Sequence, residues 1–295
     1  MQELFVNHVF SLESTEMINR VNMILEEYES QGYRLSLRQL YYQLVARAII
    51  PNTVQSYKRL GGIVSDGRLA GLIDWDMIED RGRETITPPM WHDPAEIVEA
   101  AAQQFAIDRW SDQPNHVEVI VEKAALEGIL IPVCRELGIR FTASRGYCSQ
   151  SVMYEIGKRL GEKGRAKWIH VLYLGDHDPS GIDMTRDVAD RLMMFSGRGV
   201  VVARLALNID QVKEWNPPEN PAKTTDSRYR AYMERFGASS WELDAVEPAT
   251  LAGLVREAVV GLRDEVLYAE ALDREQGMKN ELEDFVQEYR DKRDE

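Results

Sequence analysis

Two aspartates stand one residue apart at the end of an apolar run in WIHVLYLGDHDPSG, residues 168–181. The run predicts a buried strand, and side chains two positions apart on an extended chain point to the same side. Asp176 and Asp178 would then repel each other unless a cation lies between them. Oxygen ligands of this kind suit Mg²⁺ or Mn²⁺. The pair therefore predicts a divalent metal site, and Ser180, with Asp183 three residues later, is expected to cap the following helix.

A third carboxylate, Glu122, ends another apolar run, VEVIVE, residues 117–122. In open α/β sheets, ligands bind beyond the carboxyl ends of the strands. Glu122, Asp176 and Asp178 are therefore expected to place three acids on one rim of one sheet. A metal ion held there would neutralise the charge that develops in the transition state of phosphoryl transfer.

Other interpretations of this turn stay open. Asp176, Asp178, Ser180 and Gly181 fit the first half of a calcium-binding loop, although Asp187 stands where that loop needs Glu and the preceding segment looks like a strand. A phosphatase of the Asp-x-Asp type is another alternative, but such enzymes usually place the motif on their first strand. The simplest alternative is a turn with solvated aspartates.

The elements that would position these acids alternate between strand and helix. Val-rich and Ile-rich runs predict strands at residues 116–122, 139–144, 168–174 and 199–207. Helical patterns separate them at residues 125–138, 149–164 and 179–197. This alternation predicts an α/β fold with a mostly parallel sheet that is covered on both faces.

The N-terminal part is expected to be helical. Residues 12–29 carry apolar side chains at helical spacing, and Ser36 is an expected N-cap for a second helix over residues 37–49. A third helix is expected over residues 53–69, followed by a turn and short extended pieces over residues 70–80. This order predicts a winged helix-turn-helix, and any small helical domain is the alternative.

The Pro-rich stretch TPPMWHDP, residues 87–94, marks a domain boundary, and four parts are expected along the chain. The winged helix-turn-helix unit covers residues 1–86, and a linker with a helix over residues 94–110 covers residues 87–115. The α/β unit covers residues 116–207, and a polar loop with a helical extension covers residues 208–295.

The net charge of −14 argues, taken alone, against a protein that binds polyanions. The charge is uneven, however, because residues 30–70 carry a single acid, Asp66, against six basic residues. These residues are expected to form a DNA-binding face: Arg34, Arg38, Arg47, Lys58, Arg59 and Arg68. The acidic segment 264–295 is expected to be a solvated helix, with a partner surface as the alternative.

Several protein classes are disfavoured by composition. No apolar run of about 18 residues is present, so no membrane span is expected. The N-terminus does not read as a secretory signal. The two cysteines, Cys134 and Cys148, fit neither a disulfide framework nor a zinc pattern. A cytoplasmic, nucleoid-associated protein is the expectation.

Three motifs in order resemble the Toprim domain of the topoisomerase VI A subunit and of the related meiotic double-strand-break proteins. They are VEVIVEKAALEGIL, FTASRGYCSQSVMYEIGKRL and YLGDHDPSGIDM, within residues 116–205. That family has a Glu after its first strand, a Gly-Tyr turn after its second and a Gly-Asp-x-Asp-Pro-x-Gly turn after its third. The matching residues are Glu122, Gly146 with Tyr147, and residues 175–181.

The stretch LRQLYYQL resembles the Arg-x-x-Tyr-Tyr motif of the winged-helix domain that precedes Toprim in this family. The second tyrosine is the family's nucleophile and forms a 5′-phosphotyrosyl link to DNA, so the resemblance assigns this role to Tyr42 and matches Arg38 to the arginine. Arg38 and Tyr42, four residues apart, share one face of a helix. A tyrosyl oxygen, with an ordinary pKa near 10, needs a nearby cation or base to attack. Half-buried helix aromatics are the alternative for Tyr41 and Tyr42.

The resemblance implies a homodimer on double-stranded DNA, in which the tyrosine of one protomer meets the metal of the other and the break is staggered. The chain is shorter than expected of a full A subunit and has no ATPase module, so a separate ATPase subunit stays open. Residues 216–248 resemble stand-alone Toprim proteins of phages and mobile elements. In that segment, Lys223 and Arg228 either contact phosphate or are simply exposed.

The function expected is metal-dependent DNA strand cleavage by tyrosine transesterification, with Tyr42, Arg38 and Glu122 as catalytic residues. One alternative is a hydrolytic Toprim endonuclease in which Tyr42 is structural. The other is a non-catalytic DNA-binding module that acts with a partner.

Overall fold

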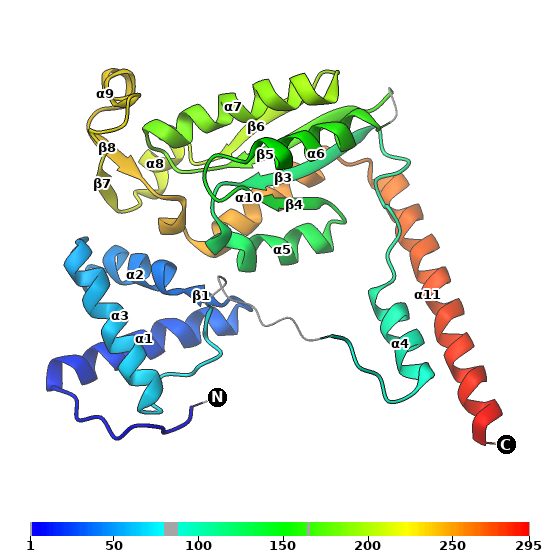
Figure 1. Cartoon of the computed structure of the whole chain (residues 1–295), viewed down its shortest axis with the longest axis horizontal. Helices are drawn as coiled ribbons and strands as arrows, with labels where there is room; N and C mark the ends of the chain where they lie inside the picture. The colour runs from blue at the N-terminus through cyan, green and yellow to red at the C-terminus, as the bar shows by residue number, and fades with distance from the viewer. Residues whose placement is uncertain (1, 80–87, 164–165, 295) are drawn as a thin grey trace.

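A four-stranded parallel sheet forms the centre of the computed structural model, which describes residues 2–79, 88–163 and 166–294 (Figure 1). Its strands are β3 (Asn115–Val121), β4 (Arg140–Ala143), β5 (Trp168–Leu174) and β6 (Val201–Ala206), in the order β4–β3–β5–β6. The predicted α/β class with a mostly parallel sheet is confirmed. β3 and β5 are paired along their whole length, up to Val121 beside Leu174, so both end at the same level.

Alternating side chains of the central strands enter two separate cores, as expected of parallel strands covered on both faces. In β3, Ile120 packs with α6 (Gln150–Gly161) and α7 (Pro179–Ser196), whereas Val119 packs with α5 (Glu127–Glu136) and α10 (Pro248–Val260). A short 3-10 turn, η1 (Ala124–Leu126), leads from β3 into α5. The sequence groups α10 with the C-terminal extension, but in the structure this helix covers one face of the sheet.

The N-terminal helices are α1 (Leu12–Ser30), α2 (Leu37–Ala46) and α3 (Val54–Leu69), and they enclose a core of their own. Ser36 caps α2 as expected, in a capping box with Gln39. Two short strands, β1 (Leu35–Ser36) and β2 (Ile78–Glu79), pair in parallel. The rest of the predicted winged helix-turn-helix unit, residues 80–86, lies outside the described residues.

A lobe follows the sheet: α8 (Ile209–Trp215), β7 (Glu219–Pro221), α9 (Tyr229–Phe236), β8 (Ser239–Trp241) and the 3-10 turn η2 (Leu243–Ala245). The polar loop expected within residues 208–295 therefore contains β7, which pairs antiparallel with β8. Turn η2 contacts α2, so the lobe joins the N-terminal helices to the sheet.

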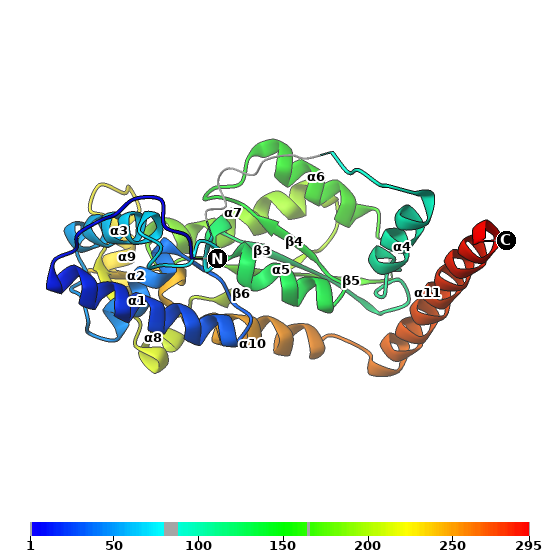
Figure 2. The ribbon, with the colours of Figure 1, turned by 90° about the horizontal axis from the view of Figure 1, so that it is seen from below.

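Two helices far apart in the sequence, α4 (Pro94–Gln104) and α11 (Glu265–Asp294), lie side by side and extend away from the sheet (Figures 1 and 2). The predicted helix over residues 94–110 ends early, at Gln104, because the chain then turns to bury Trp110 in the core. No helix in the described part of the chain is long and apolar enough to cross a membrane.

Candidate functional site

Glu122 and Asp176 meet at the rim of the sheet because β3 and β5 are neighbours and end at the same level. Each residue is only 7% exposed, and the Asp176 backbone N–H donates to Glu122 Oε2 at 2.9 Å. Burial raises the pKa of both carboxyls above their usual range, and in Glu122 the negative charge of Asp176 adds to this rise. Ionisation of both groups therefore costs free energy.

Asp178 takes a different position from the one expected for a rim ligand. It is the N-cap of α7, and its Oδ1 accepts from Gly181 N at 2.6 Å and from Ser180 Oγ at 3.0 Å. The prediction that Ser180 caps this helix is wrong. Pro179 takes the first helical position, which suits its fixed φ and missing N–H, so the cap is Asp178, two residues before Ser180.

Two glycines let this turn pack against the rim. A Cβ on Gly175 would lie 2.8 Å from Glu122 Oε2, and one on Gly181 would lie 2.2 Å from the Asp176 carbonyl oxygen. Neither contact leaves room for a side chain. The spacing of the two glycines around Asp176 and Asp178 is therefore a packing requirement of the site itself.

Lys123 supplies the positive charge at the rim. Its Nζ lies 2.9 Å from Asp176 Oδ2, 2.9 Å from Glu242 Oε2 and 2.8 Å from Asp244 Oδ2. These carboxylates, despite the burial of Lys123, raise the pKa of its ammonium above its usual range. This ammonium is therefore charged and is bound by three carboxylates.

The donor chemistry of the rim fits a divalent cation in part. Glu122 and Asp176 offer carboxylate oxygens that Mg²⁺ or Mn²⁺ prefers, and the charge of Asp178 is near enough to raise the pKa of Glu122. Within the described residues, however, no group of three or more His, Cys, Asp or Glu side chains is arranged to hold a metal ion. Asp178 faces the helix end and Lys123 already binds Asp176.

Tyr42 and Arg38 lie on α2, and the charges of Arg38, Glu242 and Lys123 act on the Tyr42 phenol. Tyr42 is 3% exposed, and Asn220 Nδ2 donates to its hydroxyl at 3.2 Å. Burial, with the charge of Glu242, raises the pKa of Tyr42 to about 12, and the charges of Arg38 and Lys123 oppose that rise. Tyr42, Arg38 and Glu242 line a cavity of about 470 Å³. The phenol thus has a route to solvent although its own surface is nearly covered.

Glu242 and Asp244 connect the tyrosine helix to the rim. Arg38 Nη2 lies 2.7 Å from Glu242 Oε2, and Arg38 Nε lies 3.6 Å from Asp244 Oδ2. The same two carboxylates bind Lys123, so one ion-pair cluster runs from Arg38 through Lys123 to Asp176. Sequence reasoning missed these two acids. Their only local signal is an acid-x-acid spacing like that of Asp176 and Asp178.

His177, between the two rim aspartates, holds this connecting segment in place. Its backbone exchanges two hydrogen bonds of 2.9 Å with Trp241, and its ring packs against Tyr232, Phe236 and Trp241. The backbone N–H of Leu243 donates to Asp176 Oδ1 at 2.7 Å. The lobe therefore fixes Glu242 and Asp244 over the rim.

The expected DNA-binding residues are less available than their count indicates. Arg47 pairs with Glu27 at 2.8 Å and Arg59 with Glu13 at 2.8 Å, both acids of α1 that lie outside residues 30–70. Arg68 donates to the backbone carbonyls of Trp75 and Ile78. Arg34 and Lys58 are exposed. The basic face is therefore partly neutralised by the helix packed beside it.

Arg228 and Lys223 differ in their surroundings. Arg228 Nε lies 2.9 Å from Asp183 Oδ2, and its guanidinium lies 5.3 Å from the centre of the Tyr147 ring. The Tyr147 hydroxyl donates to the same carboxylate at 2.8 Å. Asp183 thus ties the lobe and the Gly-Tyr turn to α7, while Lys223 is exposed.

Comparison of the chain with protein-family models and with curated proteins finds no match. The Toprim resemblance therefore rests on its motifs, and what it implies about activity is argued below as a proposal.

Proposed function

We propose that the protein cleaves DNA strands by metal-dependent tyrosine transesterification, as a Toprim protein similar to the topoisomerase VI A subunit. On this proposal the sheet and its helices are the Toprim domain, and residues 1–86 are a winged helix-turn-helix unit. One observation carries the proposal: an ion-pair cluster runs from Arg38 through Glu242 and Lys123 to Asp176, which contacts Glu122, and the charges of this cluster act on the Tyr42 phenol. Buried carboxyls with perturbed pKa values are typical of functional sites.

Each residue of the cluster has a role in this reaction. The phenolic oxygen of Tyr42 forms a bond to phosphorus, the DNA 3′ oxygen leaves and takes up a proton, and the phenolic proton passes to water. Arg38 and Lys123 place positive charge near the phenol and counteract the effect of burial on its pKa. Glu122 and Asp176 would hold the divalent cation, which supplies charge neutralisation at the phosphate.

The ion-pair cluster favours pairing of Tyr42 with the rim of its own chain, whereas the resembled family pairs them across a homodimer. Mixing the Tyr42→Phe and Glu122→Gln variants distinguishes the two arrangements. Restored cleavage in the mixture requires pairing across protomers, because only then does one site hold both intact residues. No restoration is expected if the two act within one chain.

Hydrolysis is the second candidate, and the state of Tyr42 favours it. The phenol is buried, accepts a hydrogen bond from Asn220 and has a pKa of about 12, so it is protonated at neutral pH in this conformation. Water would then attack the phosphate and Tyr42 would serve packing. A non-catalytic DNA-binding module has no comparable observation in its favour.

Supercoiled plasmid, incubated with the protein and Mg²⁺ or Mn²⁺ and then denatured, separates these candidates. Transesterification predicts nicked or linear DNA that carries protein until protease is added. Tyr42→Phe is expected to abolish this product, while Tyr41→Phe, one residue away and bonded to Asn52 and Thr53 instead, is expected to retain it. Full cleavage by Tyr42→Phe would show that hydrolysis is the mechanism. Plasmid that stays intact with both metals would favour the non-catalytic DNA-binding module.

A further inference from the structure

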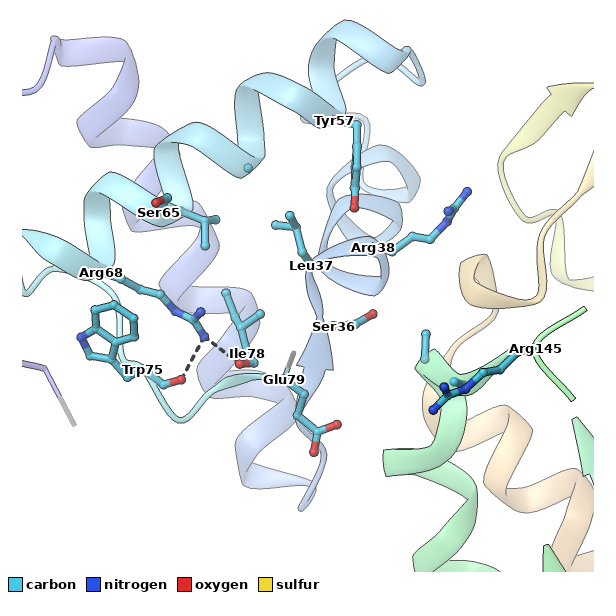
Figure 3. A pocket seen from close by; sticks show the side chains of 14 residues that line it. Ser36, Leu37, Arg38, Tyr57, Ser65, Arg68, Trp75, Ile78, Glu79 and Arg145 are labelled. Carbon is cyan, nitrogen blue, oxygen red and sulfur yellow. Dashed lines mark hydrogen bonds between the residues drawn. The ribbon is translucent and has the colours of Figure 1, made fainter. Parts of the chain in front are cut away.

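A second cavity, of about 650 Å³, lies beside the tyrosine cavity, and Arg38 and Tyr57 line both. The N-terminal helices form one side of it, and η1 with the turn after β4 forms the other (Figure 3). The volume is within the range of pockets that hold small organic ligands. The cavity is therefore large enough for a nucleotide and is continuous with the wall of the proposed active site.

Arg145 faces this cavity from the turn after β4, opposite the side chains of α2 and α3 (Figure 3). Its guanidinium makes no hydrogen bond or ion pair with any other described residue, in contrast to Arg38. Its backbone has a φ of 54°, a left-handed conformation that residues with a Cβ rarely adopt. Such conformations persist where the surroundings impose them, often at binding sites.

The opposite wall combines an aromatic ring with apolar and cationic groups and one acid, Glu79. Trp75 is 39% exposed, and the Arg68 guanidinium lies 5.3 Å from the centre of its ring. The position of Arg68 is fixed by hydrogen bonds to the carbonyls of Trp75 and Ile78. Leu37 and Ile78 add apolar surface between the two walls (Figure 3).

We propose that this cavity is a nucleotide subsite, in which Arg145 binds a phosphate and the base packs against Trp75 and the neighbouring apolar wall. Arginine suits phosphate because its planar fork donates two hydrogen bonds, and aromatic rings stack on any base. The same chemistry would accept one nucleotide of a DNA strand or a free nucleoside phosphate. As a part of the DNA path, the subsite rests on the proposed function, because Arg38 would join it to the phosphate at Tyr42.

Fluorescence anisotropy of a labelled single-stranded oligonucleotide, measured with the full chain in EDTA, tests the subsite without any cleavage. Arg145→Gln and Trp75→Ala are each expected to weaken binding roughly tenfold. Arg145→Gln should also lower the dependence of affinity on salt, since one phosphate contact is lost. Arg135→Gln in α5 and Trp168→Ala at the start of β5, both exposed and outside the cavity, serve as controls and should bind as the wild type.

Two further ligands distinguish the sources of the nucleotide. An abasic oligonucleotide should lose the effect of Trp75→Ala and keep that of Arg145→Gln, which supports the assigned roles. If free ATP instead displaces the oligonucleotide from the wild type, and both substitutions weaken this displacement, a free nucleoside phosphate is identified as the ligand. Unchanged binding of both ligands by both variants overturns the subsite. If Arg145→Gln and Trp75→Ala bind normally and still cut plasmid, the proposed function is supported and the subsite is not. If the two substitutions weaken binding but the wild type leaves plasmid intact, the subsite is supported and the proposed function is not.

Discussion

Two buried ionic clusters in this molecule have opposite balances of charge. At the rim, five carboxylates (Glu122, Asp176, Asp178, Glu242 and Asp244) interact with three cations (Lys123, Arg38 and the buried Arg204). Where α11 meets the body, the single carboxylate of Glu275 faces two cations.

The pKa values follow this balance. At the rim, burial raises the pKa of Glu122 and of Asp176. In the second cluster, hydrogen bonds from Arg109, Lys279 and the Ile107 backbone lower the pKa of Glu275 to about 2. A fully paired carboxylate stabilises the fold, whereas a surplus of buried acids is maintained at a cost and suits the binding of a further cation. The cluster at α11 is therefore a structural one, and the rim is the cluster that fits the proposed cation site.

Removal of Lys123, the cation at the centre of the rim, should cause the largest loss of stability. Lys123→Met leaves Asp176 and Asp244 buried without their shared partner, and we expect the free energy of unfolding to fall by about 3–5 kcal/mol. Urea denaturation measures this change. Lys213→Met, an exposed lysine of α8, is the control and should be neutral. A loss no larger than that of the control would show that the rim does not depend on Lys123.

The close packing of the rim turn gives the next largest effect. Gly181→Ala places a Cβ 2.2 Å from the Asp176 carbonyl oxygen, so the turn must shift, and we expect about 2 kcal/mol of destabilisation. Gly253→Ala in α10 meets nothing within 4 Å and should stabilise the protein by about 0.5–1 kcal/mol. Thermal denaturation of the two variants side by side checks the contrast, and equal melting temperatures would contradict the packing account.

The cluster at α11 should show the pH dependence of a paired acid. Because the folded pKa of Glu275 is lowered to about 2, its contribution is complete above the unfolded pKa of about 4.5 and is lost as pH falls toward 2. Glu275→Gln should therefore cost about 1–2 kcal/mol at pH 7. The difference from the wild type should shrink below pH 4.5, as measured by urea denaturation across the pH range. If the difference in the free energy of unfolding between the two proteins is constant with pH, the ion pair is not its cause.

The surplus of acids at the rim predicts an opposite result for Glu122→Gln. The neutral amide relieves the repulsion from Asp176, so in metal-free buffer at pH 8 the variant should be about 1 kcal/mol more stable than the wild type. Mg²⁺ should raise the melting temperature of the wild type and leave that of the variant unchanged. A variant that is less stable, or that responds to Mg²⁺ as the wild type does, would count against a cation site at Glu122.

Patterns within single segments were enough to predict the sheet and part of the site. Glu122 and Asp176 were predicted to meet because each follows an apolar strand, and parallel strands end at a common edge. The role of Asp178 as a helix cap was missed, although Pro179 beside it is a usual signal for a helix start.

Residues that depend on distant packing could not be predicted. Glu242 and Asp244 reach the rim only because Trp241 pairs with His177, and no local pattern marks that contact. The basic face is weaker than its sequence indicates for the same reason, because Glu13 and Glu27 of α1, outside residues 30–70, neutralise two of its arginines.

Mapping of a covalent DNA–protein adduct tests the central claim most directly. Labelled plasmid is incubated with the protein and Mg²⁺ or Mn²⁺, the reaction is denatured, and the DNA-linked peptide is identified by mass spectrometry after nuclease and protease digestion. The account predicts a phosphotyrosyl peptide of α2 with the nucleotide on Tyr42, absent from Tyr42→Phe and from Glu122→Gln. Cleaved DNA without any linked peptide, or an adduct on another residue, would contradict it.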